Sequence, residues 1–142
     1  MTQIDFYTGA PDRLLIACRL CAKAMQQGLR TIVHVPDTDL AERLDKLLWT
    51  FMSTSFVPHC RVGDKLAEVT PVVVNNQPGL SGAGNFDVLL NLDGVVPPEI
   101  GQFRRVVEVV DEAEENKLLG RKRYRIYQGQ GYDIRHHRLG GS

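Results

Sequence analysis

Several features that mark common classes of protein are missing from this chain of 142 residues. Seventeen Lys and Arg residues balance seventeen Asp and Glu residues, so the chain lacks the excess positive charge typical of nucleic-acid-binding domains. No apolar run approaches the roughly 18 residues that predict a membrane span. No basic segment followed by an apolar one opens the chain, so no signal peptide is predicted. We therefore expect a soluble, cytoplasmic protein that does not bind a membrane.

Cysteine is scarce. Cys18, Cys21 and Cys60 are an odd number, so they cannot all pair within the chain, and reduced thiols are expected. Cys18 and Cys21 form a C-x-x-C motif, but they fall in the apolar stripe of a predicted helix. A redox pair is expected at a helix N-terminus, where the helix dipole lowers the thiol pKa. The spacing therefore favours two core thiols.

The phosphate-binding motifs of nucleotide-dependent enzymes are also missing. The first strand-to-helix turn, residues 7–13, has one glycine and no lysine, and Pro11 removes a backbone amide that an anion could use. No Ser/His/Asp spacing stands out either. We predict no catalytic residues and no cofactor. A nucleotide-dependent enzyme on a Rossmann-like fold is the alternative, for which ATP or NAD should raise the melting temperature.

A metal site could be drawn from His136 and His137 with His59 or Cys60. Adjacent histidines in a terminal segment are more often solvated, and no second close pair of ligands supports them. No metal site is predicted.

Short apolar runs alternate with helical patterns, which is typical of an α/β layer fold. A helix starting near Pro11 carries the apolar stripe Leu14, Cys18, Cys21 and Met25, and a second helix is capped by Asp37. A last helix is expected over residues 112–127. The predicted strands are residues 4–7, 31–35, 72–74, 88–92 and 106–110. We predict a single three-layer Rossmann-like domain over residues 1–142, with a largely parallel sheet flanked by helices; the strand order stays open.

The last predicted helix has an asymmetric distribution of charge. Residues 108–115 hold five acids and no base, whereas residues 117–138 hold seven bases and one acid. Acids favour a helix start and bases its end, which explains the order but not the density. Lys117, Arg121, Tyr124 and Gln128 also fall on one face. Such a stripe suits an acidic peptide, and a solvated face that binds nothing is the alternative. Direct binding of single-stranded nucleic acid is a third interpretation, which the neutral net charge disfavours.

A second candidate surface surrounds Trp49. A helix that buries Leu44, Leu47 and Phe51 points Trp49 elsewhere, and Phe56, Val57 and Pro58 add apolar area in a loop-like stretch. Exposed apolar patches usually mark contacts with other proteins. The alternative is that Trp49 and Phe56 cover one edge of the sheet.

Several segments, in their order and spacing, resemble the chi subunit of bacterial DNA polymerase III holoenzyme over nearly the whole chain. They are Phe6-Tyr7, the helix with Arg43-Leu44-Asp45 and Leu48-Trp49, residues 55–59, 87–92, 107–111 and 121–127, and Gly131-Tyr132. The resemblance implies a non-catalytic accessory subunit of the clamp-loader assembly in DNA replication. It implies two protein partners, the psi subunit and the acidic C-terminal tail of single-stranded-DNA-binding protein, with DNA contacted only indirectly.

The resemblance also implies where these partners bind. The site for the tail would comprise Val110, Lys117, Arg121, Tyr124 and Arg125, which includes the basic stripe. The psi contact would fall on Trp49, Phe56, Val57 and Pro58. At Gln128 the chain departs from what the tail would favour, since a further base would suit it better.

Overall fold

The centre of the molecule is a parallel β-sheet. The computed structural model describes residues 2–51, 57–67, 69–77, 79–80 and 85–139, and these form a sheet of seven strands in the order β3-β4-β2-β5-β6-β1-β7. Every neighbouring pair runs parallel. The strands are β1 (Gln3–Ala10), β2 (Thr31–His34), β3 (His59–Arg61), β4 (Val72–Asn75), β5 (Val88–Asn91), β6 (Arg105–Asp111) and β7 (Asp133–Arg138).

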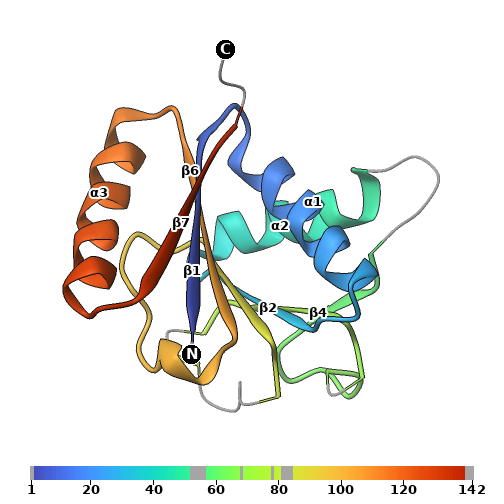
Figure 1. Cartoon of the computed structure of the whole chain (residues 1–142). Coiled ribbons are helices and arrows are strands. Elements are labelled where there is room, and N and C mark those ends of the chain that lie inside the picture. The colour runs from blue at the N-terminus through green and yellow to red at the C-terminus, as the bar shows by residue number, and fades with distance from the viewer. Residues whose placement is uncertain (1, 52–56, 68, 78, 81–84, 140–142) are drawn as a thin grey trace.

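Helices cover both faces of this sheet. Helices α1 (Arg13–Gln26) and α2 (Thr38–Thr50) lie on one face, and α3 (Glu114–Gly129) lies on the other (Figure 1). A short 3-10 helix, η1 (Ile100–Gln102), leads into β6. The predicted three-layer, largely parallel α/β fold is therefore confirmed. None of the helices in the described part of the chain is long and apolar enough to cross a membrane.

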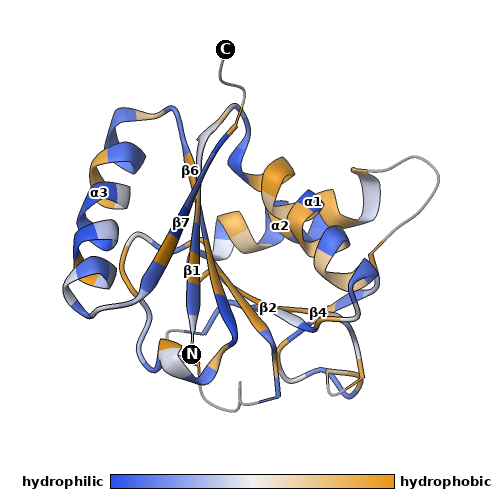
Figure 2. Cartoon of the chain, in the orientation of Figure 1, coloured by the Kyte–Doolittle hydropathy of each residue, from blue (hydrophilic) through white to orange (hydrophobic). Residues whose placement is uncertain are grey.

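Two hydrophobic cores form because alternate side chains of each strand point to opposite faces of the sheet. One core lies between the sheet and helices α1 and α2. It contains Val33, Val107 and Val109 of the strands and Leu44 and Leu48 of α2. The second core, beneath α3, contains Ile4, Phe6, Val106, Val110 and Tyr127. In Figure 2 apolar residues are concentrated in the strands and on α1 and α2, whereas α3 is mostly hydrophilic. Helix α3 is thus the most hydrophilic of the three helices, although Leu118 and Ile126 are exposed on it.

Helices α1 and α2 each begin at a capping aspartate. The Asp12 carboxylate accepts hydrogen bonds from the backbone amides of Leu14 (3.1 Å) and Leu15 (3.2 Å), so Asp12 rather than Pro11 opens α1. Asp37 caps α2 as predicted, accepting from the Leu40 amide at 3.1 Å. The last helix begins at Glu114, two residues later than expected, and continues to Gly129.

The C-x-x-C prediction is confirmed. Cys18 and Cys21 are free thiols with no exposed area, inside the core beneath α1. Burial raises the pKa of Cys18 to about 12 and that of Cys21 further still. Both sulfurs are therefore held as inert thiols.

Strands β3 and β7 were not predicted. β3 has only three residues, and all three are half-buried. The sequence predicts solvated histidines in a terminal segment here, whereas β7 pairs with β1 along six residues. Both strands lie at the edges of the sheet, where a strand needs little apolar sequence because one side meets solvent.

Candidate functional site

The candidate site is a cavity of about 600 Å³ between α3 and the carboxyl ends of three strands. In parallel α/β sheets, ligands generally bind beyond this edge. β1 contributes Phe6, Thr8 and Gly9. The other lining residues are Val110, Asp111 and Glu112 at the end of β6, Lys117, Gly120, Arg121 and Tyr124 on α3, and His136, Arg138 and Leu139 on and after β7.

The apolar floor of the cavity depends on a close approach of α3 to β6. Gly120 lies directly over Val110: a Cβ atom at position 120 would come within 2.9 Å of Val110 Cγ2. The Tyr124 ring meets the Phe6 ring edge-on, with 5.2 Å between ring centres. Val110, Phe6 and Tyr124 therefore provide an apolar base beneath the charged rim.

The rim carries uneven charge. Lys117 Nζ lies 3.7 Å from Glu112 Oε2 and 3.4 Å from Glu114 Oε1, so its charge is partly matched. Arg121 and Arg138 make no ion pair or hydrogen bond through their side chains with any residue that the structure describes. Two guanidinium groups thus remain available to an incoming anion.

The structure brings together four of the five residues assigned to the tail site. Val110, Lys117, Arg121 and Tyr124 line this one cavity. Arg125 lies exposed on the same helix, outside the lining, and Gln128 is exposed as well. Three of the four residues of the predicted basic stripe therefore line this cavity, and Gln128 does not.

Two charged residues counted in the surface asymmetry are buried instead. Glu108 has no exposed area, and Arg123 is 3% exposed. The Glu108 carboxylate accepts hydrogen bonds from Arg123 Nε (2.9 Å), Asn91 Nδ2 (2.9 Å) and Tyr127 Oη (2.6 Å). Burial raises the pKa of Glu108, and the charge of Arg123 opposes that rise. This buried network ties α3 to β5 and β6, so it positions the helix rather than binding a partner.

The β7 side of the cavity was missed because β7 itself was not predicted. Nε2 of His136 lies 2.7 Å from the Thr8 hydroxyl on β1. His137 points to the opposite face, where it contacts Asp5 (2.9 Å) and stacks on Tyr7. The two histidines therefore do not converge. Among the described residues, no group of His, Cys, Asp and Glu side chains could hold a metal ion. The alternation of Ile134 with polar neighbours was the one signal for a strand here.

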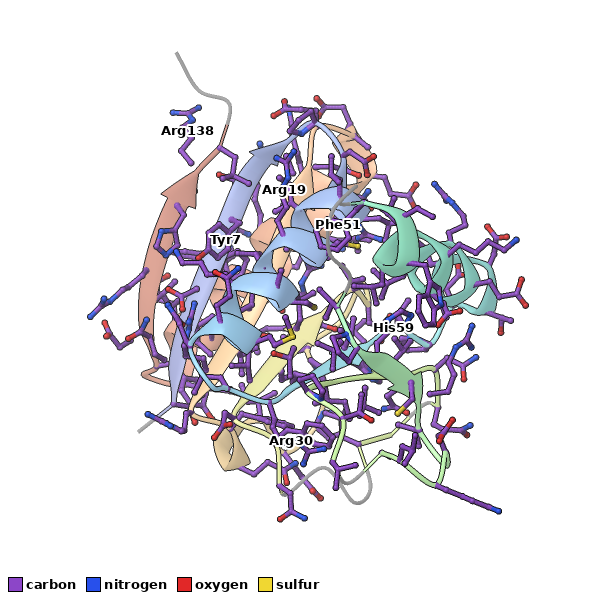
Figure 3. All side chains as sticks on the ribbon, turned by 90° about the vertical axis from the view of Figure 1, so that its right-hand side faces the viewer. Tyr7, Arg19, Arg30, Phe51, His59 and Arg138 are labelled. Carbon is purple, nitrogen blue, oxygen red and sulfur yellow. The ribbon has the colours of Figure 1, made fainter. Side chains whose placement is uncertain are left out.

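The second candidate surface lies around the end of α2, across the sheet from α3. Trp49 is 54% exposed and borders an open hollow of about 660 Å³, which also includes Arg43, Lys46 and Leu47. Its ring centre is 4.8 Å from that of His59, which Figure 3 places on β3 below α2. Pro58 is exposed, whereas Val57 is 1% exposed and belongs to the core. Phe56 lies outside the described residues.

Comparison with known proteins identifies the family. A family model for the DNA polymerase III chi subunit matches residues 1–135. The chi subunit of Pseudomonas aeruginosa PAO1 is 34% identical over 98% of both chains, and that of Escherichia coli K12 is 29% identical over 84% of this chain and 80% of its own. The chain belongs to the DNA polymerase III chi family. It is thus similar to accessory subunits of the replicative polymerase.

The chi fold is shared with domains of other functions. The C-terminal domain of S. cerevisiae Dbp5 matches with a TM-score of 0.56 at 13% identity, covering 94% of this chain and 88% of that one. Domain 2 of the DEAD-box helicase Mss116p matches with a TM-score of 0.60 at 12% identity, covering 99% and 64%. At such low identity these matches show the fold alone.

This chi-family member differs from a nucleotide-binding fold at the turn after β1. The backbone amides of Leu14 and Leu15, which open α1, already donate to the Asp12 carboxylate. A phosphate at this turn would lose those donors and face a negative charge. At this turn the first two amides of α1 named here are therefore already used by a side-chain cap.

Proposed function

We propose that this chain is a non-catalytic adaptor that links the psi subunit to the acidic C-terminal tail of single-stranded-DNA-binding protein. The observation that carries the proposal is the cavity beneath α3, where an apolar floor lies next to Arg121 and Lys117. A peptide that ends in an apolar side chain and a free carboxylate has matching chemistry. The apolar side chain would lie on Val110 and Tyr124, and Arg121 would bind the carboxylate.

Rough energies indicate a weak, exchangeable interaction. Burial of an apolar terminal side chain contributes about 1.5–3 kcal/mol. A charge-assisted hydrogen bond from Arg121 to the terminal carboxylate adds roughly 1.5–3 kcal/mol, and exposed pairs such as one with Lys117 add about 0.2–1 kcal/mol each. After the costs of association, affinity near the micromolar range is expected, falling as salt is raised. That strength suits a tether that must exchange during replication.

The decisive test is a fluorescence-anisotropy titration with an acidic peptide ending in Phe. Arg121→Ala should weaken binding at least tenfold, because it removes the group that binds the terminal carboxylate. Arg19→Ala is the matched control, since Arg19 is an exposed arginine on α1, on the opposite face of the sheet (Figure 3). Both variants should keep the wild-type melting temperature. Equal affinities for wild type and Arg121→Ala would remove the cavity as the tail site.

The psi surface is the second part of the proposal. Trp49 lies on the layer opposite α3, so two partners bound at the two surfaces would not compete for space (Figure 1). Trp49→Ala should reduce co-purification with the psi subunit and leave the affinity for the acidic peptide unchanged. Retention of psi by this variant would place the psi contact elsewhere.

The same samples separate the alternatives. Addition of ATP or NAD should leave the melting temperature unchanged, since the turn after β1 is capped by Asp12. A fluorescent single-stranded oligonucleotide should show little binding at physiological salt. A clear shift in the first assay would favour a nucleotide-dependent enzyme, and tight retention in the second would favour direct DNA binding.

A further inference from the structure

The cavity has a second wall, formed by β7, which faces the helical wall. Side chains alternate along a strand, and Ile134 packs into the core beneath α3. His136 and Arg138 therefore project toward α3, and both line the cavity. Arg135 and His137 project to the other face, where His137 contacts Asp5. One strand thus presents an arginine to the cavity and an arginine away from it.

The end of β7 is held in place. The Leu139 amide donates to the Thr8 carbonyl at 2.8 Å, and His136 Nε2 lies 2.7 Å from the Thr8 hydroxyl. Gly9 has a φ of +74°, and a Cβ atom there would come within 2.6 Å of the Leu139 carbonyl oxygen. The glycine therefore permits the close approach of β7 to β1 that fixes the backbone on both sides of Arg138.

The basic side chains of the two walls differ in whether an acid lies within ion-pair distance of them. Glu112 and Glu114 lie within ion-pair distance of Lys117. The Asp111 carboxylate, the other acid in the lining, accepts hydrogen bonds from the Ala113 amide (3.1 Å) and Asn116 Nδ2 (2.9 Å). Arg121 and Arg138 have no such partner among the described residues. A ligand with a single carboxylate would satisfy one of the two guanidinium groups and leave the other unmatched.

We propose that Arg138 forms a second anion-binding position in this cavity, which takes an acidic side chain upstream of the peptide terminus. Arg121 binds the terminal carboxylate on the α3 wall, and Arg138 binds a preceding Asp or Glu on the β7 wall. The inference rests on the proposed function and narrows its ligand to a peptide with at least two separated carboxylates. The β7 wall thereby selects an acidic tail over a neutral peptide with the same terminus.

The test is a double-mutant cycle between protein and peptide at low ionic strength. One labelled peptide carries acidic residues before its terminal Phe, and its matched partner has every upstream Asp and Glu replaced by Asn and Gln. Arg138→Ala should weaken binding of the acidic peptide roughly two- to fivefold, the range of an exposed ion pair. The same variant should bind the neutralised peptide as wild type does. Arg138→Glu should produce a larger loss with the acidic peptide alone.

Arg135→Ala is the control, because it removes an exposed arginine from the same strand on the opposite face. It should bind both peptides like the wild type. If Arg138→Ala binds the acidic peptide normally, or weakens both peptides equally, the second position is refuted while the proposed function stands. If wild type binds neither peptide, or Arg121→Ala has no effect, the proposed function fails and this inference fails with it.

Discussion

The two candidate surfaces differ in how the fold distributes the residues predicted for them. On the α3 side, the residues belong to one helix and three strand ends, and the buried Glu108–Arg123 ion pair fixes that helix to the sheet. On the α2 side, Trp49 stands near a helix end, Val57 lies in the core, and Phe56 lies outside the described residues. The comparison teaches that helical spacing predicts which side chains share a surface. Consecutive apolar residues in a segment between two elements, such as Val57 and Pro58, can instead point in different directions.

The largest expected effect comes from breaking the network beneath α3. Arg123→Ala leaves the Glu108 carboxylate buried without its charge partner, which should lower the free energy of unfolding by about 3–5 kcal/mol. The peptide cavity should lose affinity, while psi binding at the α2 surface persists wherever the variant remains folded. Urea denaturation and the two binding assays check this.

Two variants control for the ion pair. Lys122→Ala removes an exposed base that directly precedes Arg123 in the chain. It should change neither the free energy of unfolding nor the affinity for the peptide by much. The double variant Glu108→Leu, Arg123→Met removes both charges and should be far more stable than Arg123→Ala. Equal instability of the single and double variants would show that charge pairing is not what holds α3.

A smaller effect is expected at the contact between α3 and β6. Gly120→Ala places a methyl group against Val110, and the clash outweighs the better helix propensity of alanine, for a net loss of about 1 kcal/mol. Peptide affinity should fall because α3 moves off the apolar floor. Gly129→Ala is the matched control, since no atom lies within 4 Å of a Cβ added there. A Gly120→Ala variant with normal peptide affinity would show that this contact does not shape the cavity.

The protonation of His34 should change the stability of the whole fold, and so should not distinguish the two candidate surfaces. Burial lowers the pKa of His34, and the carboxylate of Asp93, 3.8 Å away, opposes that shift. The folded chain keeps this imidazole neutral at a pH where the unfolded chain protonates it, so stability falls as the pH drops below about 6.5. From pH 7 to 5.5 we expect a loss in the free energy of unfolding that His34→Gln lacks, measured by urea denaturation at each pH. Identical pH profiles for the two proteins would contradict this assignment.

The smallest effect on stability is expected at Trp49. Because the side chain is 54% exposed, Trp49→Ala should change the free energy of unfolding by about 0.5 kcal/mol or less. Its main effect should be on psi binding, so the ratio of binding loss to stability loss is largest at this residue. A loss of stability above 2 kcal/mol would indicate that Trp49 supports the fold.

The sequence predicted the interior of the fold well. The apolar runs that became β2, β4, β5 and β6 are buried on both faces, so hydrophobicity alone identifies them. The edge strand β7 has the sequence of a solvated segment because its polar side chains meet solvent. Its identity as a strand comes from pairing with β1, a partner 130 residues away in sequence, and the spacing of Ile134 among polar residues is only a weak local signal.

The buried ion pair shows a similar limit. Arg123 has the same helical context as Lys122 and Arg125, and only its position over β6 buries it. A signal was present in the strand, since Glu108 stands among four valines and an acid in such a run requires a buried partner. Which base supplies that partner depends on the rotation of α3, and helical spacing leaves that rotation undetermined.

The position of β1 in the sheet determines when this chain can fold. β1 is synthesised first, yet both of its neighbours, β6 and β7, lie more than 90 residues later in the chain. On the ribosome, β1 therefore cannot form its sheet hydrogen bonds until most of the polypeptide has emerged. Contacts between residues so far apart in sequence also slow folding. The same strand forms one side of the cavity beneath α3, so a nascent chain completes this cavity only in the last stage of folding.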